Sequence, residues 1–132
     1  MRLYLDAVAI IYAVERMEPW ATLVAARIRD AQAAPITSEL SCLECKVRPL
    51  RLDQHDVVAR FDAFFAEGVG ELLPVSREVL EQAAALRAKH NFLRTPDAIH
   101  LATAMTAKCD VFLTNDNRLD RFTEIAVEVL AV

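Results

Sequence analysis

The chain has 132 residues, a length that predicts one domain over residues 1–132 with a core large enough to need no disulfide or structural metal. Its 55% hydrophobic and 26% charged residues, with only two glycines, exclude a disordered or low-complexity protein. The net charge of −4 counts against a protein that grips nucleic-acid phosphates over its whole surface, but not against acids gathered around a cation.

The sequence predicts a cytoplasmic protein with no membrane segment. Its longest apolar stretches, such as residues 7–14, are far shorter than the roughly 20 residues that a membrane span needs. The N-terminus lacks the residue order of a signal peptide. An odd number of cysteines favours reduced thiols, and Cys42-x-x-Cys45 could be half of a zinc site, although no second pair of ligands has matching spacing.

The first half of the chain predicts two short strands and three helices. Residues 2–5 are a short apolar run that ends at Asp6, and the next residues are helix formers without a breaker. Ser38 offers an N-cap, and Pro49 is expected to limit the helix that follows. In order, we expect a strand over 2–5, helices over 7–15 and 17–33, a strand over 34–37 and a helix between Ser38 and Pro49.

The second half predicts three more strands and three more helices. Gly68 and Gly70 break an amphipathic segment, and Thr95-Pro96-Asp97 has the residue order of a helix start, with Thr95 as the N-cap. In order, we expect a helix over 53–65, a strand over 71–75, a helix from Ser76 to about residue 90, a helix from Thr95 through 107, and strands over 111–114 and 126–132.

This alternation of strands and helices favours a parallel sheet, because each crossover helix returns the chain to the same edge. We therefore predict an α/β fold, a three-layer α/β/α sandwich with a short, mostly parallel five-stranded sheet. In such sheets, ligands bind beyond the carboxyl ends of the strands. The residues that follow the strands are therefore the first candidates for a functional site.

Four acids occupy such positions. Asp6 and Asp116 end the first and fourth predicted strands, Glu44 lies about two turns into the helix after the second, and Asp97 lies in the first turn of a helix. Any one of them could be only a helix cap. Together they would repel one another unless a cation with a preference for oxygen ligands, such as Mg²⁺ or Mn²⁺, neutralised them. One or two such ions could activate a water for phosphodiester hydrolysis.

Four stretches resemble, in order, the acidic motifs of the PIN-domain family. The stretches are Tyr4-Leu5-Asp6, Thr37-Ser38-Glu39-Leu40-Ser41-Cys42-Leu43-Glu44, Thr95-Pro96-Asp97-Ala98-Ile99-His100-Leu101-Ala102-Thr103-Ala104 and Phe112-Leu113-Thr114-Asn115-Asp116. They span nearly the whole chain. The sequence departs from the family after Asp6, where Ala7 and Val8 stand in place of small polar residues, so a hydroxyl that could steady water or phosphate is missing.

The resemblance implies a function as well as a fold. It implies that Asp6, Glu44, Asp97 and Asp116 hold Mg²⁺ or Mn²⁺ and that an activated water cuts RNA. Single-domain members of this length resemble the VapC toxins of toxin–antitoxin pairs. In these pairs a small VapB-like antitoxin covers the active site, and the toxin commonly forms a homodimer.

Further residues near the acids are weaker candidates. Thr114 and Asn115 could orient Asp116 or a bound water, and Asp120 is a lesser candidate for the same role. Candidate contacts to RNA phosphates are Lys46, Arg94 and Arg118, although solvated surface charge is the commoner role for each. His100, on an apolar helix face one turn beyond Asp97, is expected to be packed and hydrogen-bonded rather than a general base.

Two other functions remain open. A phosphatase of the haloacid-dehalogenase kind could use Asp6 as a nucleophile, but it would need a second aspartate two residues later, where Val8 stands. A binding module with this fold and little catalysis would fit the Ala7-Val8 departure and the net acidic charge. The four acids argue against that module, because a purely structural domain has no reason to accept their repulsion.

Overall fold

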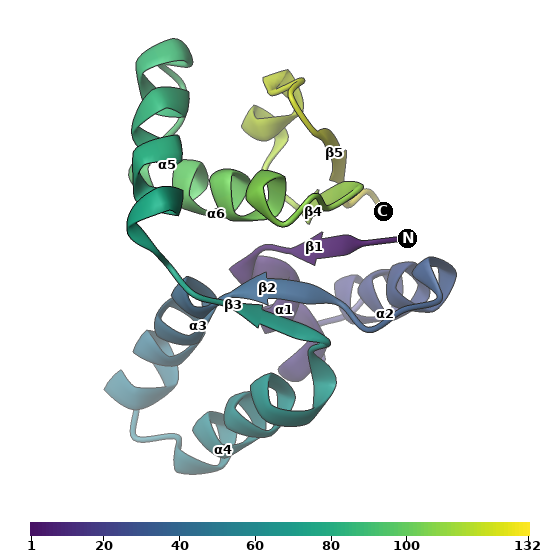
Figure 1. The fold of residues 1–132 in the computed structure, drawn as a ribbon. Helices are drawn as coiled ribbons and strands as arrows, with labels where there is room; N and C mark the ends of the chain where they lie inside the picture. Colours follow the sequence, from purple (N-terminus) through teal and green to yellow (C-terminus); the bar gives the residue numbers. More distant parts are fainter.

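The computed structural model describes all 132 residues, and its five strands form one parallel sheet (Figure 1). The strands are β1 (Leu3–Leu5), β2 (Ile36–Ser38), β3 (Glu71–Leu73), β4 (Val111–Thr114) and β5 (Ala126–Val129). Their order across the sheet is β3-β2-β1-β4-β5, and every neighbouring pair is parallel. The predicted five-stranded parallel sheet is therefore confirmed.

Six α-helices cover the two faces of the sheet, which confirms the predicted three-layer sandwich. They are α1 (Ala7–Val14), α2 (Trp20–Ala31), α3 (Glu39–Arg51), α4 (His55–Ala63), α5 (Arg77–Lys89) and α6 (Thr95–Thr106). The first four lie on one side of the sheet, and α5 and α6 lie on the other (Figure 1). A membrane-spanning helix is not found among them.

Alternate side chains of the central strands enter two separate cores. Leu5 and Leu113 pack with the helices of the α1 side, whereas Tyr4 and Phe112 pack with α5 and α6. This alternation follows from the twofold period of a strand. Because both faces are covered, β1 and β4 are apolar at nearly every position, which is why short apolar runs identified them in the sequence.

Serine caps begin two of the helices, as predicted. The Ser38 hydroxyl accepts a hydrogen bond from the backbone N–H of Leu40 (3.0 Å) at the start of α3. The Ser76 hydroxyl accepts one from the N–H of Val79 (3.2 Å) at the start of α5. Each cap satisfies a backbone donor that the first helical turn leaves without a partner.

Removing the cap at Ser76 is expected to cost stability. Ser76→Ala should lower the free energy of unfolding by about 1 kcal/mol, whereas Ser76→Asp, which keeps an acceptor, should change it by less than about 0.5 kcal/mol. Urea denaturation followed by circular dichroism measures both. Equal losses in the two variants would show that the cap contributes little.

Two of the predicted helix boundaries were wrong. Pro49 does not limit α3: it is buried inside the last turn, and the helix continues to Arg51. Its missing N–H removes only one bond near the end of the helix, where the loss is small. Thr95 is not the N-cap of α6, because Arg94 takes that position and the Asp97 carboxylate accepts a hydrogen bond from the Arg94 N–H (3.0 Å).

Two short turns were not predicted as elements. A π-helical turn, η1 (Phe64–Gly68), extends α4, and a 3₁₀ helix, η2 (Asn117–Arg121), follows β4. The Asp116 carboxylate caps η2 by accepting a hydrogen bond from the N–H of Arg118 (2.9 Å). This local turn brings the Arg118 side chain back over Asp116, at the carboxyl end of the sheet.

Candidate functional site

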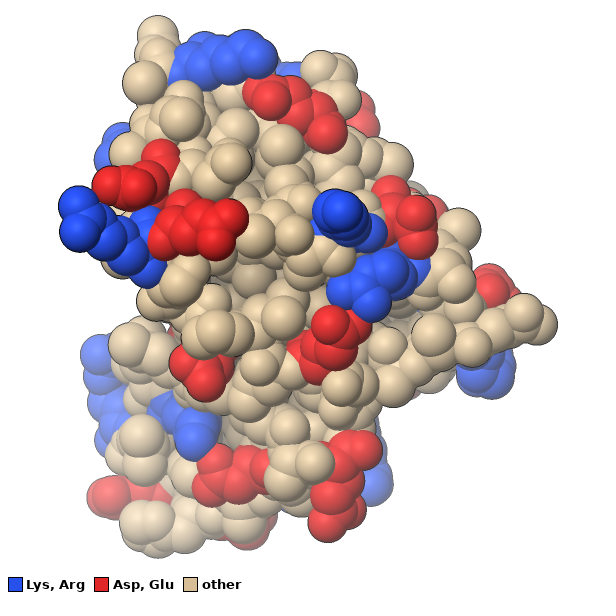
Figure 2. All heavy atoms as spheres, in the orientation of Figure 1, with Lys and Arg blue, Asp and Glu red and all other residues tan.

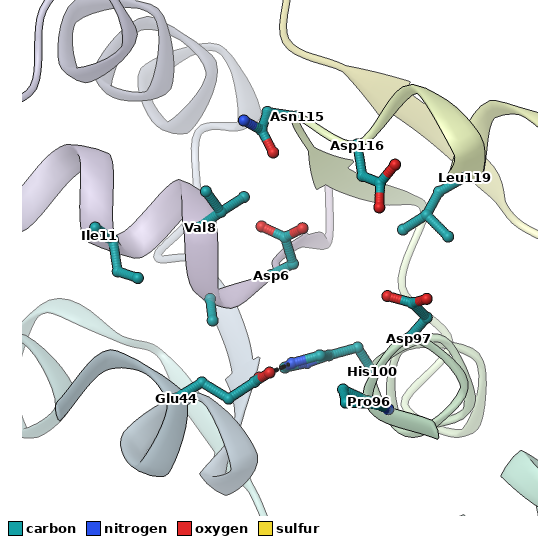
Figure 3. A pocket seen from close by; sticks show the side chains of 11 residues that line it. Asp6, Val8, Ile11, Glu44, Pro96, Asp97, His100, Asn115, Asp116 and Leu119 are labelled. Atoms are coloured by element: carbon teal, nitrogen blue, oxygen red, sulfur yellow. Dashed lines mark hydrogen bonds and ion pairs between the residues drawn. The ribbon is translucent and has the colours of Figure 1, made fainter. Parts of the chain in front are cut away.

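The four predicted acids all line one pocket of about 340 Å³ (Figure 3). Asp6 lies between β1 and α1, and Asp116 lies between β4 and η2. Glu44 comes from α3 and Asp97 from the first turn of α6. The pocket therefore collects one carboxylate from each of four separate parts of the chain, at the edge of the sheet where the sequence predicted a site.

Asp6 lies at the centre of the pocket, between Asp116 and Glu44 (Figure 3). Its carboxylate caps α1 by accepting a hydrogen bond from the Ala9 N–H (3.1 Å). Burial raises the pKa of Asp6 to about 6, and the charge of Glu44 adds to the rise, although hydrogen bonds from Thr114 and Ala9 oppose it. A cation beside Asp6 would reverse this effect and keep the carboxylate ionised.

A hydrogen-bonded chain of side chains holds Glu44. The Nε2 atom of the buried His100 lies 2.5 Å from Glu44 Oε1, and its Nδ1 atom lies 2.6 Å from the Tyr4 hydroxyl. A carboxylate oxygen accepts hydrogen bonds, so Nε2 carries the proton of this contact, and in the neutral imidazole Nδ1 then accepts from the Tyr4 hydroxyl, whose pKa burial raises. Nε2 is then the donor to Glu44, and His100 acts through Glu44 as a positioning residue.

His100 is thus packed and hydrogen-bonded, as predicted, but it also lines the pocket, a place that was not predicted for it. The spacing of His100 and Asp97 in the sequence could have predicted this position. Residues three apart on a helix share a face, so His100 must lie on the same side of α6 as Asp97.

Asp97 and Asp116 share an arginine. The Nη2 atom of Arg118 lies 2.6 Å from Asp116 Oδ2 and 3.3 Å from Asp97 Oδ2, and its Nε atom donates to Asp116 Oδ1 (3.2 Å). Burial works to raise the pKa of Asp116, but the hydrogen bonds and charge of Arg118 outweigh it and hold that pKa below its ordinary value. One positive charge from within the chain therefore partly offsets the two negative charges of Asp97 and Asp116.

The donor set fits a hard divalent cation, because four carboxylates supply the oxygen ligands that Mg²⁺ and Mn²⁺ prefer. As the side chains stand, no three His, Cys, Asp or Glu residues anywhere in the chain converge closely enough to hold a metal ion. Chelation at this pocket therefore requires side-chain movement.

The same finding leaves Cys42 and Cys45, which are free thiols, without the further ligands that zinc would need.

The structure brings two of the three predicted supporting residues to the site. The buried Thr114 hydroxyl accepts a hydrogen bond from the Asp116 N–H (3.1 Å), and Asn115 lines the pocket while its amide donates to the Tyr12 hydroxyl. Asp120 is exposed and does not line the pocket.

Of the three predicted RNA contacts, only Arg118 reaches the acids. Lys46 forms an ion pair with Asp62 (2.6 Å) and lies beside a separate apolar pocket. Arg94 is exposed and does not line the pocket, although its backbone N–H donates to Asp97 and its charge helps to lower the pKa of Asp116. Figure 2 shows positive and negative side chains interspersed over the visible face, without a broad basic surface.

Apolar side chains complete the pocket. Val8 and Ile11 from α1 face Leu119 from η2 across the acids (Figure 3). Val8, Ile11 and Glu44 also line a second pocket of about 430 Å³, which extends the site toward α3 and the residues after α1. Val8 thus forms part of an apolar wall at the position where a polar residue was expected from the resemblance.

The sequence model of the PIN domain matches residues 3–125 of this chain. The solved structure of a toxin–antitoxin complex from Klebsiella pneumoniae is similar with a TM-score of 0.78 at 18% identity, over 98% of this chain and 97% of that one. VapBC2 from Rickettsia felis, bound to a promoter DNA fragment, gives a TM-score of 0.80 at 12% identity over 98% of each chain.

A third solved structure is VapC20 of Mycobacterium tuberculosis, a toxin that cleaves the sarcin–ricin loop. It gives a TM-score of 0.74 at 16% identity, over 94% of this chain and 98% of that one. No curated protein matches the sequence. At these identities the structural similarity establishes a shared fold, while the sequence match covers nearly all of the chain. This chain belongs to the PIN-domain family.

Proposed function

We propose that this chain is a metal-dependent endoribonuclease that acts as the toxin of a toxin–antitoxin pair. The observation that carries the proposal is the single pocket at the carboxyl edge of the sheet, which four carboxylates from four parts of the chain line. Membership of the PIN-domain family supports a nuclease, and the toxins among the similar structures support this biological role.

In this proposal Asp6, Glu44, Asp97 and Asp116 hold one or two ions of Mg²⁺ or Mn²⁺. When bound, the ions would supply positive charge that activates an attacking water and neutralises the phosphodiester. The chain itself orients the ligands: His100 fixes one oxygen of Glu44, and the Thr114 hydroxyl contacts the backbone beside Asp116. Val8, Ile11 and Leu119 give the pocket an apolar wall beside the acids.

The proposed partners are RNA, a VapB-like antitoxin and a second copy of the chain, in the cytoplasm. The Klebsiella and Rickettsia structures are a toxin–antitoxin complex and a VapBC complex. The second pocket, continuous with the site through Val8 and Ile11, offers an antitoxin an apolar surface beside the acids. Exposed Leu43, Val47 and Leu50 on α3 support a homodimer, and free thiols suit a reducing compartment.

The test is cleavage of total cellular RNA by purified protein, free of antitoxin, with Mg²⁺, Mn²⁺ or EDTA. We expect discrete fragments with either metal and none with EDTA, and re-added metal should restore cutting. Asp97→Asn keeps the acceptor for the Arg94 N–H but removes the charge, so it should not cut. Glu67→Gln, an exposed carboxylate outside the pocket, is the matched control and should behave like the wild type.

Two outcomes would contradict the proposal. Equal cutting by the wild type and Asp97→Asn would mean that a contaminating nuclease or another site cleaves the RNA. A folded wild type that cuts no RNA with any metal would favour a binding module, whose RNA or protein ligand would then be sought by binding measurements.

A further inference from the structure

The guanidinium of Arg118 occupies the position between Asp97 and Asp116. Three of its hydrogen bonds go to these two carboxylates, and a fourth runs from Nη1 to the backbone carbonyl of Phe92 (3.2 Å). The fork of an arginine matches carboxylate oxygens well, and the bonds are charge-assisted. Arg118 therefore contacts both oxygens of Asp116 and one oxygen of Asp97, which are groups that could otherwise bind a metal ion.

The arrangement of the acids agrees with this occupation. Although four carboxylates line the pocket, no three of them converge closely enough to chelate an ion. Two of the four are turned toward Arg118, and Glu44 is turned toward His100 (Figure 3 shows the latter contact). Without a counter-ion these anions would repel one another across a partly buried pocket. Arg118 supplies that counter-ion from within the chain.

We propose that Arg118 is the resident cation of this site and that a divalent metal ion binds in competition with it, by displacing its guanidinium from Asp97 and Asp116. The inference rests on the proposed metal-dependent function. The Arg118 side chain has room to move away, because it is 37% exposed and comes from a short 3₁₀ helix whose Leu119 lines the pocket.

The displaced guanidinium remains beside the site. The backbone N–H of Arg118 donates to Asp116, which fixes the backbone at this position. The displaced side chain can therefore swing no farther from the pocket than its own length. There it is free to bind a phosphate oxygen of RNA, the contact that planar guanidinium groups make well. Arg118 would thus offset part of the negative charge of Asp97 and Asp116 before metal binds and contact the substrate afterwards.

The experiment measures the affinity of the metal-free protein for Mn²⁺ by calorimetry, with no RNA present. The test variants are Arg118→Gln, which keeps much of the stem without the charge, and Arg118→Lys, which keeps the charge without the fork. The control is Arg121→Gln: Arg121 lies on the same 3₁₀ helix but stacks over the Phe92 ring (4.5 Å) and forms no ion pair.

Competition predicts that removing the charge tightens metal binding. We expect Arg118→Gln to bind Mn²⁺ about three to ten times more tightly than the wild type, as the loss of one partly exposed cation with two partners suggests. Arg118→Lys should lie between the two, and Arg121→Gln should match the wild type. In the wild type, titration with Mg²⁺ should shift the Arg118 Nε–H resonance in a saturable way.

Different failures can be told apart. If the wild type binds Mn²⁺ and a cooperatively folded Arg118→Gln binds it equally or more weakly, competition is wrong while the metal-dependent function stands. If neither the wild type nor any variant binds Mn²⁺ or Mg²⁺, the inference and the proposed metal dependence fail together. If the chemical shift of the Arg118 Nε–H resonance does not change at saturating Mg²⁺, the guanidinium is not displaced and the inference is wrong.

Discussion

Asp6→Asn is expected to abolish RNA cleavage and, at the same time, to stabilise the metal-free protein at neutral pH. The asparagine can still cap α1 through the Ala9 N–H, so the local structure should persist. It cannot supply a charged ligand. Loss of a residue behind a metal ligand already costs up to about a hundredfold, so we expect loss of the ligand itself to lower activity by at least that factor. Fragment formation from total RNA with Mn²⁺ measures this loss.

The stabilisation follows from the pKa of Asp6, which burial raises from 3.8 to about 6 in the folded protein. Between these two pH values the folded state binds more protons than the unfolded state, so this residue makes the free energy of unfolding fall as pH rises. The full effect, present above pH 6, is up to about 3 kcal/mol. Asparagine has no such cost.

Urea denaturation in EDTA, from pH 4 to pH 8, tests this prediction. The difference in stability between Asp6→Asn and the wild type should grow with pH through that interval and level off above about pH 6. Glu67→Gln should show no such growth. A difference that stays constant with pH would mean that folding does not raise the pKa of Asp6.

His100→Phe is expected to weaken Mn²⁺ binding by about tenfold to a hundredfold, as loss of a hydrogen-bonding partner behind a metal ligand typically does. Phenylalanine fills the buried space but cannot donate to Glu44, and it leaves the Tyr4 hydroxyl without its acceptor. His100→Gln can still offer a donor to Glu44, so it should recover part of the affinity. Calorimetric titration of Mn²⁺ into each metal-free variant measures the change.

The matched control is His55→Phe, at an exposed position on the first residue of α4. It should bind Mn²⁺ as the wild type does. Thermal unfolding identifies any variant that has lost its fold. If His100→Phe and His100→Gln both fold and both bind Mn²⁺ with wild-type affinity, His100 is a packed core residue and does not position Glu44.

The sequence predicted the sheet and the acids for a shared physical reason. Strands covered on both faces are short apolar runs, and the residue after such a run lies at the edge where ligands bind. Asp6 and Asp116 follow directly from this rule. Placing Glu44 and Asp97 also required the correct start of their helices. The error in the cap of α6 did little harm, because Thr95 is only one residue from the observed N-cap, Arg94.

The basic residues were harder to assign, because nearness in sequence does not fix direction. Lys46 is two residues from Glu44 on a helix, and residues two apart do not share a face, so its side chain points elsewhere. Arg118 is also two residues from an acid, Asp116, but a capped turn separates them instead of an α-helix and brings the side chains together. Only the backbone geometry distinguishes the two cases.

The Tyr4–His100–Glu44 chain also links the two layers of the molecule. Tyr4 lies in the core beneath α5 and α6, where its ring stacks on Phe112 (5.1 Å between ring centroids), while Glu44 belongs to α3 on the opposite side of the sheet. The stacked rings of Tyr4 and Phe112 on one side of the sheet therefore support the position of Glu44, a proposed metal ligand, on the other side. Phe112 does not line the pocket itself, so its link to the acids runs only through Tyr4 and His100.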